Sequence, residues 1–121
     1  MSWTQILLIV AALALFFLLR HMGQISASAA REYLKNGAVV VDVRTEGEHA
    51  AGHLPQAILV PLDRIETALP KRIRDKNTVL LLYCQSGMRS GIAKRKVQAL
   101  GYAQAFNLGS MTRASRIVAK K

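Results

Sequence analysis

The chain opens with a long apolar segment and continues with shorter apolar runs that are separated by polar turns. Residues 6–19 (ILLIVAALALFFLL) are apolar without interruption. A run of this length lies at the lower limit for a membrane-spanning helix and also fits the core of a signal peptide. Counted from Trp3 to Met22, the segment is long enough to cross a bilayer, with Trp3 and the pair Arg20 and His21 as interface anchors. We therefore expect a transmembrane helix at residues 3–22.

The charges around this segment predict its orientation. No lysine or arginine precedes the apolar residues, whereas Arg20 follows them directly. Positive residues flank the cytoplasmic end of a membrane helix, so we expect the amino terminus outside the inner membrane and the rest of the chain in the cytoplasm. The alternative is a cleaved signal peptide, because Ala27-Ser28-Ala29 fits a cleavage site. Cleavage there would make the remainder periplasmic.

Beyond residue 23 the apolar positions alternate between the spacing of strands and the spacing of helices. Apolar or β-branched runs predict strands at residues 38–43, 57–60, 78–83 and 103–107. Capping and turn residues predict four helices beside these strands. The first runs from a cap at Ser26 or Ser28 to residue 34, and the second covers 45–51. The third runs from a cap at Asp63 to residue 69 and ends at Pro70, and the fourth covers 90–100 and ends at Gly101. Alternating strands and helices predict an α/β fold with a parallel sheet covered on both faces.

Composition and charge restrict the class of protein. Of 121 residues 51% are hydrophobic, which excludes intrinsic disorder. Lysine and arginine number 17 against 7 acidic residues, for a net charge of +10. No acidic residue follows position 75, so the end of the chain is positively charged. We expect the basic tail at 111–121 to form a short helix on the domain or a strip against anionic lipid. We expect no nucleic-acid partner, because no aromatic residues interleave with the basic ones.

The single cysteine, Cys84, carries the clearest chemical signal. It excludes an intramolecular disulfide and follows the strongest predicted strand, a few residues before a predicted helix. The segment between them reads Cys84-Gln85-Ser86-Gly87-Met88-Arg89-Ser90. A loop that enters a helix amino terminus can direct several backbone N–H groups to one point, and Gly87 permits the positive φ that such a curl requires. This setting favours a nucleophilic thiolate over an inert buried cysteine.

Three motifs in this order resemble the rhodanese family of sulfurtransferases in its single-domain form. They are Asp42-Val43-Arg44 with Glu48, the turn from Gly52 to Ala57, and the loop from Cys84 to Ser90. The resemblance covers a domain at residues 25–110 and implies the rhodanese α/β fold. Because it begins at Ile25, cleavage after Ala29 would cut into that fold, which favours the retained helix. The chain departs from the family in lacking paired glycines and a tryptophan after its last strand.

The resemblance implies a sulfur relay without a metal or an organic cofactor. Cys84 would take the sulfane sulfur of a small anionic donor such as thiosulfate and pass it to cyanide or a thiol acceptor. The backbone amides of Gln85, Ser86, Gly87, Met88, Arg89 and Ser90 would stabilise the anionic persulfide. The alternative is a non-enzymatic rhodanese module that carries a persulfide or docks a protein at the membrane.

The resemblance also indicates roles for the polar residues around the loop. Arg89 would either bind the anionic donor or brace the loop through a carboxylate, and Asp42 would border the site. Arg44 and Glu48 are expected to form a structural ion pair. Related phosphatases have a wider loop, so we place phosphate chemistry below sulfur transfer. His49 and His53 are expected to be an exposed residue and a turn residue rather than metal ligands, because Gly52 and Pro55 interrupt their helix.

Overall fold

The computed structural model describes residues 2–119, and the elements of this part follow the predicted alternation. The helices are α1 (Trp3–Met22), α2 (Ala27–Lys35), α3 (Glu46–Ala51), the 3-10 turn η1 (Leu62–Arg64), α4 (Ile65–Arg72), α5 (Met88–Ala99) and α6 (Met111–Ala119). The strands are β1 (Val39–Asp42), β2 (Ile58–Leu59), β3 (Leu80–Cys84) and β4 (Ala105–Ser110). All four predicted strands are therefore present, each shifted by a few residues at most.

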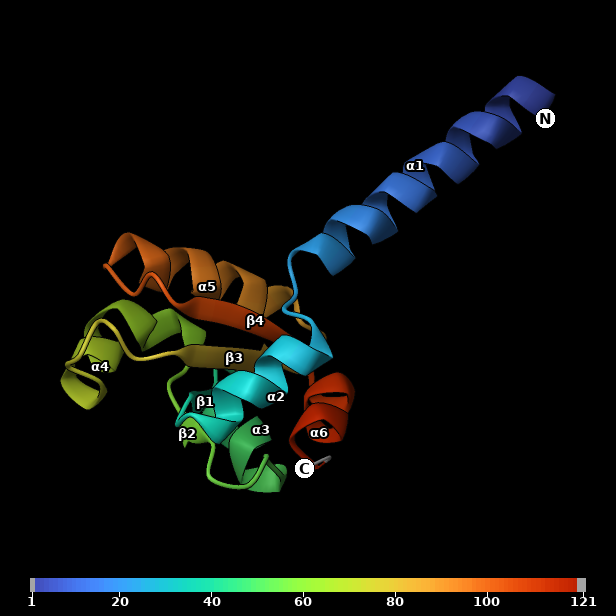
Figure 1. The fold of residues 1–121 in the computed structure, drawn as a ribbon. Helices are drawn as coiled ribbons and strands as arrows, with labels where there is room; N and C mark the ends of the chain where they lie inside the picture. The colour runs from blue at the N-terminus through green and yellow to red at the C-terminus, as the bar shows by residue number, and fades with distance from the viewer. Residues whose placement is uncertain (1, 120–121) are drawn as a thin grey trace.

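The four strands form one parallel sheet in the order β2-β1-β3-β4. All five residues of β3 are buried, as expected for a central strand that is covered on both faces. Helices α4 and α5 pack on one face of the sheet, and α2 and α6 pack on the other (Figure 1). This arrangement confirms the predicted α/β architecture.

Successive residues of β3 divide between the two faces, as the alternation of side chains in a strand requires. Leu80, Leu82 and Cys84 belong to the core beneath α4 and α5. Leu81 and Tyr83 belong to the core beneath α2 and α6. Cys84 thus lies on the same face of the sheet as α5, at the carboxyl end of the central strand.

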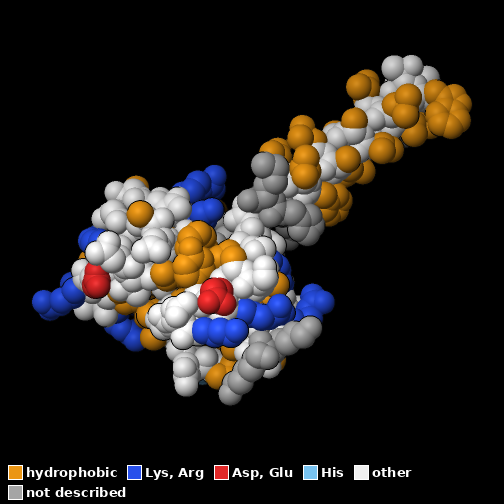
Figure 2. Space-filling view, in the orientation of Figure 1, with side chains coloured by type: hydrophobic (Ala, Val, Ile, Leu, Met, Phe, Trp, Pro, Cys, Tyr) orange, Lys and Arg blue, Asp and Glu red, His pale blue; other side chains and the backbone are white. Residues whose placement is uncertain are grey.

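Helix α1 extends away from the rest of the molecule (Figure 1). Its described side chains, at residues 3–19, are exposed, and most of them are apolar (Figure 2). Within residues 2–119, no helix meets the combined length and hydropathy of a membrane-spanning helix, so the predicted transmembrane helix at 3–22 is not supported. The side chains of the expected anchors Arg20 and His21 lie outside the described residues.

The junction between α1 and the domain is fixed to the sheet. Ile25 N–H donates to the carbonyl oxygen of Asn107 on β4 at 3.0 Å. The guanidinium of Arg113 donates to the carbonyl oxygen of Ile25. Ser26 then caps α2 by accepting from Ala29 N–H, which confirms one of the two predicted caps.

Helix α4 differs from its prediction at both ends. Asp63 does not cap it, because residues 62–64 form the turn η1 and Arg64 occupies the cap position without a side-chain hydrogen bond. Pro70 lies inside the helix instead of ending it. The chain completes one more turn, in which Ile73 N–H donates to Leu69 O at 2.8 Å. Proline removes one donor but does not prevent the following residues from closing the turn.

The carboxy-terminal segment forms the short helix that was one of its two predicted states. Helix α6 buries Ala114 and Ile117 against β3 and β4. Lys120 and Lys121, the last two residues of the predicted basic tail, lie outside the described residues. The tail is therefore part of the packed domain as far as Ala119.

Candidate active site around Cys84

Cys84 is the last residue of β3 rather than the first residue after it. It pairs with Ser110 on β4 and is fully buried. Gly87 N–H donates to Cys84 Sγ at 3.0 Å, and Ser90 Oγ lies 3.5 Å from the same sulfur. Burial raises the pKa of the thiol, but hydrogen bonds from Ser90 and from the amides of Gly87 and Ser86 outweigh it, so the pKa lies below its ordinary value. The environment therefore favours the thiolate.

Gly87 gives the loop its shape. It caps α5 with φ at 93°, in the left-handed region that favours glycine, which confirms the predicted positive φ. Helix α5 begins at Met88, two residues earlier than predicted, so the loop turns directly into the helix. A Cβ at Gly87 would come 3.1 Å from Gln24 Nε2 and 3.4 Å from the backbone of Gly109. Glycine is required at position 87 because its φ is in the left-handed region and because a Cβ would crowd Gln24 and Gly109.

The remaining loop residues are held by β4 and the start of α6. Gln85 O accepts from Met111 N–H at 3.3 Å, and Ser86 forms an antiparallel bridge with Ser110. The side chain of Met88 is 66% exposed. The loop is thus anchored on its β4 side and open at Met88.

Asn107 is a buried residue of this site that the sequence reasoning missed. Its Nδ2 donates to Gly87 O at 3.0 Å, and its Oδ1 accepts from Ser90 Oγ at 2.7 Å and from Gly109 N–H at 2.9 Å. Its sequence signal is a polar residue between the apolar residues Phe106 and Leu108 in the segment that forms β4. Buried amides are retained where their hydrogen bonds are satisfied, so this side chain ties α5 to β4 behind the sulfur.

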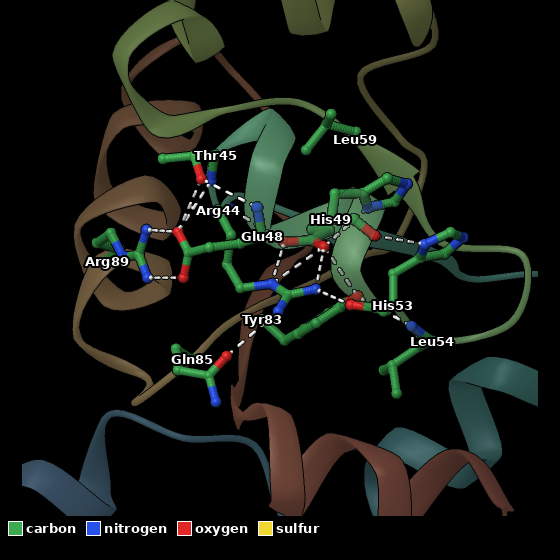
Figure 3. Close-up of polar contacts among 12 residues, drawn as sticks. Arg44, Thr45, Glu48, His49, His53, Leu54, Leu59, Tyr83, Gln85 and Arg89 are labelled. Carbon is green, nitrogen blue, oxygen red and sulfur yellow. Dashed lines mark hydrogen bonds and ion pairs between the residues drawn. The ribbon is translucent and has the colours of Figure 1, made fainter.

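Arg89 braces the loop in this structure. Its Nη1 and Nη2 donate to the two carboxylate oxygens of Glu48 at 2.7 and 2.9 Å (Figure 3). The expected pair between Arg44 and Glu48 is therefore wrong. Thr45 is the extended cap of α3, which places Arg44 before the helix, and the capping box directs Glu48 back to Thr45.

The Arg89–Glu48 pair predicts a pH dependence of stability. Hydrogen bonds from Arg89 and from Thr45 lower the pKa of Glu48 from 4.5 to about 2. A depressed folded-state pKa stabilises the protein above the unfolded pKa, and this contribution is lost as the pH falls toward the folded pKa. We expect Glu48→Gln to lower the free energy of unfolding at pH 7 by up to about 1 kcal/mol, because the pair is partly exposed.

Urea unfolding of both proteins measures this effect. The difference between wild type and Glu48→Gln should shrink as the pH falls from about 5 to about 2. Glu66→Gln removes the exposed pair with Lys96, 3.2 Å long, and is the matched control with a smaller expected effect. A difference for Glu48→Gln that stays constant over this pH range would contradict the assignment.

Asp42 and Arg44 form a buried network that reaches the loop, and Figure 3 shows Arg44 between Tyr83 and Gln85. Arg44 Nε and Nη2 donate to the two oxygens of Asp42, at 3.0 and 2.8 Å, and Arg44 Nη1 donates to Gln85 Oε1 at 3.2 Å. Tyr83 OH also donates to Asp42 at 3.1 Å. Burial raises the pKa of Asp42, but hydrogen bonds from Arg44 and His49 outweigh it and keep that pKa below its ordinary value. Asp42 therefore supports the site through Arg44 and Gln85.

His49 and His53 stack with ring centroids 3.7 Å apart. His49 is not exposed as predicted, because its side chain is 18% exposed and its Nδ1 lies 2.9 Å from Asp42 Oδ2. His53 is exposed and its Nδ1 contacts the carbonyl oxygen of His49, as expected for a residue of the turn. Among residues 2–119, no three histidine, cysteine or acidic side chains lie together as a metal site.

A cleft of about 780 Å³ lies beside the loop, on the side of Arg89. Val43, Pro61 and Leu62 contribute apolar lining, and Arg64, Arg89 and Lys96 contribute positive charge. All three cations are in ion pairs: Arg64 with Glu46, Arg89 with Glu48, and Lys96 with Glu66. The structure thus brings the predicted loop residues together at Cys84. Asp42 contacts the loop indirectly, because Arg44 lies between it and Gln85. The open cleft lies next to the loop.

Comparison with known proteins gives one consistent result. The rhodanese-like domain family matches residues 26–113. The thiosulfate sulfurtransferase PspE of Escherichia coli is 31% identical over 71 residues, which are 59% of this chain and 68% of that protein. The human thiosulfate:glutathione sulfurtransferase is 31% identical over 69% of this chain and 84% of its own length. The solved structure of the human single-domain sulfurtransferase TSTD1 superposes with a TM-score of 0.67 at 28% identity, covering 82% of this chain and 97% of that one. Residues 26–113 cover most of the chain, and the chain belongs to the rhodanese-like domain family.

Proposed function

We propose that the protein is a sulfurtransferase that moves a sulfane sulfur through a persulfide on Cys84. The observation that carries this proposal is the setting of the Cys84 sulfur, which accepts a hydrogen bond from Gly87 N–H at 3.0 Å and has a lowered pKa. It is supported by family membership and by the named activities of the Escherichia coli and human relatives.

The proposed reaction has two displacements on sulfur. In the first, the Cys84 thiolate attacks the sulfane sulfur of thiosulfate, a new S–S bond forms, and sulfite leaves with the electrons of the broken S–S bond. In the second, an acceptor such as cyanide or a thiolate attacks the terminal sulfur, and Cys84 leaves as a thiolate. The amide of Gly87 faces Cys84 Sγ, and the positive charge of Arg89 lies on the neighbouring turn. Oriented donors of this kind stabilise an anion at low cost in reorganisation.

Intact-mass analysis of the purified full-length protein tests the proposal. Thiosulfate should add the mass of one sulfur atom, and cyanide should remove it while thiocyanate appears. Repeated turnover separates the enzyme from the alternative persulfide carrier, which would gain the sulfur once and release it slowly. A protein that gains no sulfur from thiosulfate or from a persulfide donor would contradict both.

The location of the domain is a separate proposal: α1 holds it at the inner membrane, with Cys84 on the cytoplasmic side. It is supported by the apolar run at 6–19, the exposed side chains of α1 and the position of Arg20. The protein should remain with membranes after a carbonate wash. In spheroplasts a membrane-impermeant thiol reagent should label Cys84 only after lysis. Release by carbonate would contradict the anchoring, and labelling before lysis would assign the domain to the periplasm.

A further inference from the structure

Two buried side chains behind the loop, Ser90 and Asn107, are hydrogen-bonded to each other beside the sulfur. Ser90 on α5 is fully buried, and Asn107 on β4 is 5% exposed. The Ser90 hydroxyl lies 2.7 Å from Asn107 Oδ1, 3.1 Å from Gly87 O and 3.5 Å from Cys84 Sγ. A hydroxyl has one proton, so it donates to one of these three acceptors at a time. The direction of that proton decides whether the sulfur receives a second donor besides Gly87 N–H.

The other hydrogen bonds of Asn107 leave the hydroxyl free to change its acceptor. Asn107 Oδ1 also accepts from Gly109 N–H at 2.9 Å, so it keeps a donor when Ser90 turns away. Gly87 O accepts from Asn107 Nδ2 at 3.0 Å and from Gly91 N–H at 3.2 Å, so it does not depend on Ser90. No buried acceptor is left without a partner when the hydroxyl turns to the sulfur, and the penalty for an unsatisfied buried group is avoided.

We propose that Asn107 is a positioning residue that acts through Ser90. Asn107 Oδ1 keeps the Ser90 oxygen beside the sulfur, and the hydroxyl proton turns from Asn107 Oδ1 to Cys84 Sγ when the thiol ionises. The thiol proton leaves to solvent, whereas Ser90 retains its own proton. A role of Asn107 in turnover rests on the proposed sulfurtransferase function. Its effect on ionisation of the Cys84 thiol can be measured without any sulfur transfer.

Removal of the Asn107 amide should turn the Ser90 hydroxyl away from Cys84 Sγ and toward Gly87 O. In Asn107→Ala, Gly87 O loses the donor Asn107 Nδ2 and becomes the nearest remaining acceptor for Ser90. The thiolate then loses one hydrogen bond to a charged acceptor, and we expect alkylation of Cys84 at neutral pH to slow about tenfold. Ser90→Ala removes the same donor directly and should have a similar effect. The double variant should react no more slowly than Ser90→Ala alone, because both changes remove one interaction.

The experiment measures the rate of iodoacetamide alkylation of the full-length protein against pH, by intact mass, for wild type, both single variants and the double variant. Gln104→Ala is the matched control, because it truncates an exposed amide just before β4 and should leave the pH profile unchanged. Additive effects, or a normal pH profile in a folded Asn107→Ala protein, would overturn the proposal and leave Asn107 with a purely structural role.

A second substitution at the same position keeps the test possible if Asn107→Ala does not fold. Asn107→Ser has a side chain too short to reach both Gly87 and Ser90, and the same cycle applies to it, with circular dichroism as the check of folding. Loss of folding in both variants would also overturn the proposal. The outcome is separate from that of the proposed function, because wild-type protein that gains no sulfur from thiosulfate still gives an alkylation profile.

Discussion

Replacement of Cys84 by serine is expected to abolish both the sulfur adduct and turnover, with a loss of more than about 1000-fold in kcat/KM. A serine hydroxyl remains protonated at neutral pH, and the hydrogen bonds that lower the pKa of the Cys84 thiol do not make it a comparable nucleophile. The fold should survive, because serine is slightly smaller and the hydrogen bonds of Gly87 and Ser90 can be made to its oxygen. Thiocyanate formation from thiosulfate and cyanide measures the loss.

The chain offers a direct check on this result. Cys84 is the only cysteine, so any sulfur adduct in the variant would come from another side chain or from noncovalent binding. The thermal unfolding midpoint of Cys84→Ser should stay close to that of wild type. Turnover retained in the folded variant would exclude the persulfide mechanism.

Gly87→Val is expected to lower kcat/KM by more than about tenfold, which corresponds to about 1.4 kcal/mol of lost transition-state stabilisation. Valine resists the φ of 93° found at this cap, and its side chain would meet Gln24 and the backbone of Gly109. The loop would then shift, and Gly87 N–H would no longer point at the sulfur. Steady-state kinetics with thiosulfate and cyanide measure the effect.

Gly37 supplies the matched control for this substitution. Its φ is 90°, but a Cβ there would meet nothing within 4 Å, and the residue lies between α2 and β1, at the end of the sheet opposite the loop. Gly37→Val should therefore carry a similar backbone strain and lower the stability of the protein, while turnover per folded molecule stays at the wild-type level. Equal losses of turnover in both variants would indicate a general effect of stability rather than of loop geometry.

The sheet and the loop could be predicted because their signals are local. The runs at 38–43 and 78–83 are apolar and rich in branched residues, and they form the adjacent strands β1 and β3. Gly87 sits between a buried strand and a helix, where a left-handed residue is required. Each of these features depends on neighbours in sequence, so the pattern of residues is sufficient.

The partners of charged and polar side chains could not be predicted in this way. Arg44 and Glu48 are four residues apart, but the extended cap at Thr45 separates them, and Glu48 pairs with Arg89 from another element. Asn107 contacts the loop only because β4 lies beside β3 in the sheet. Contacts of this kind follow from the assembled fold, and the sequence marks them at most by a polar residue in an apolar strand.

The fixed junction before α2 determines where the domain can be shortened for work in solution. A recombinant fragment that starts at Ser26 would keep the cap of α2 but would lose Ile25, whose N–H bonds to Asn107 O and whose carbonyl accepts from Arg113. It would also lose Gln24, which lies against Gly87 and Gly109. A fragment that starts at Gly23 retains all of these contacts while it omits the exposed apolar side chains of α1. The boundary suggested by the first capped helix is thus too late, and the earlier one preserves the support of the sulfur loop.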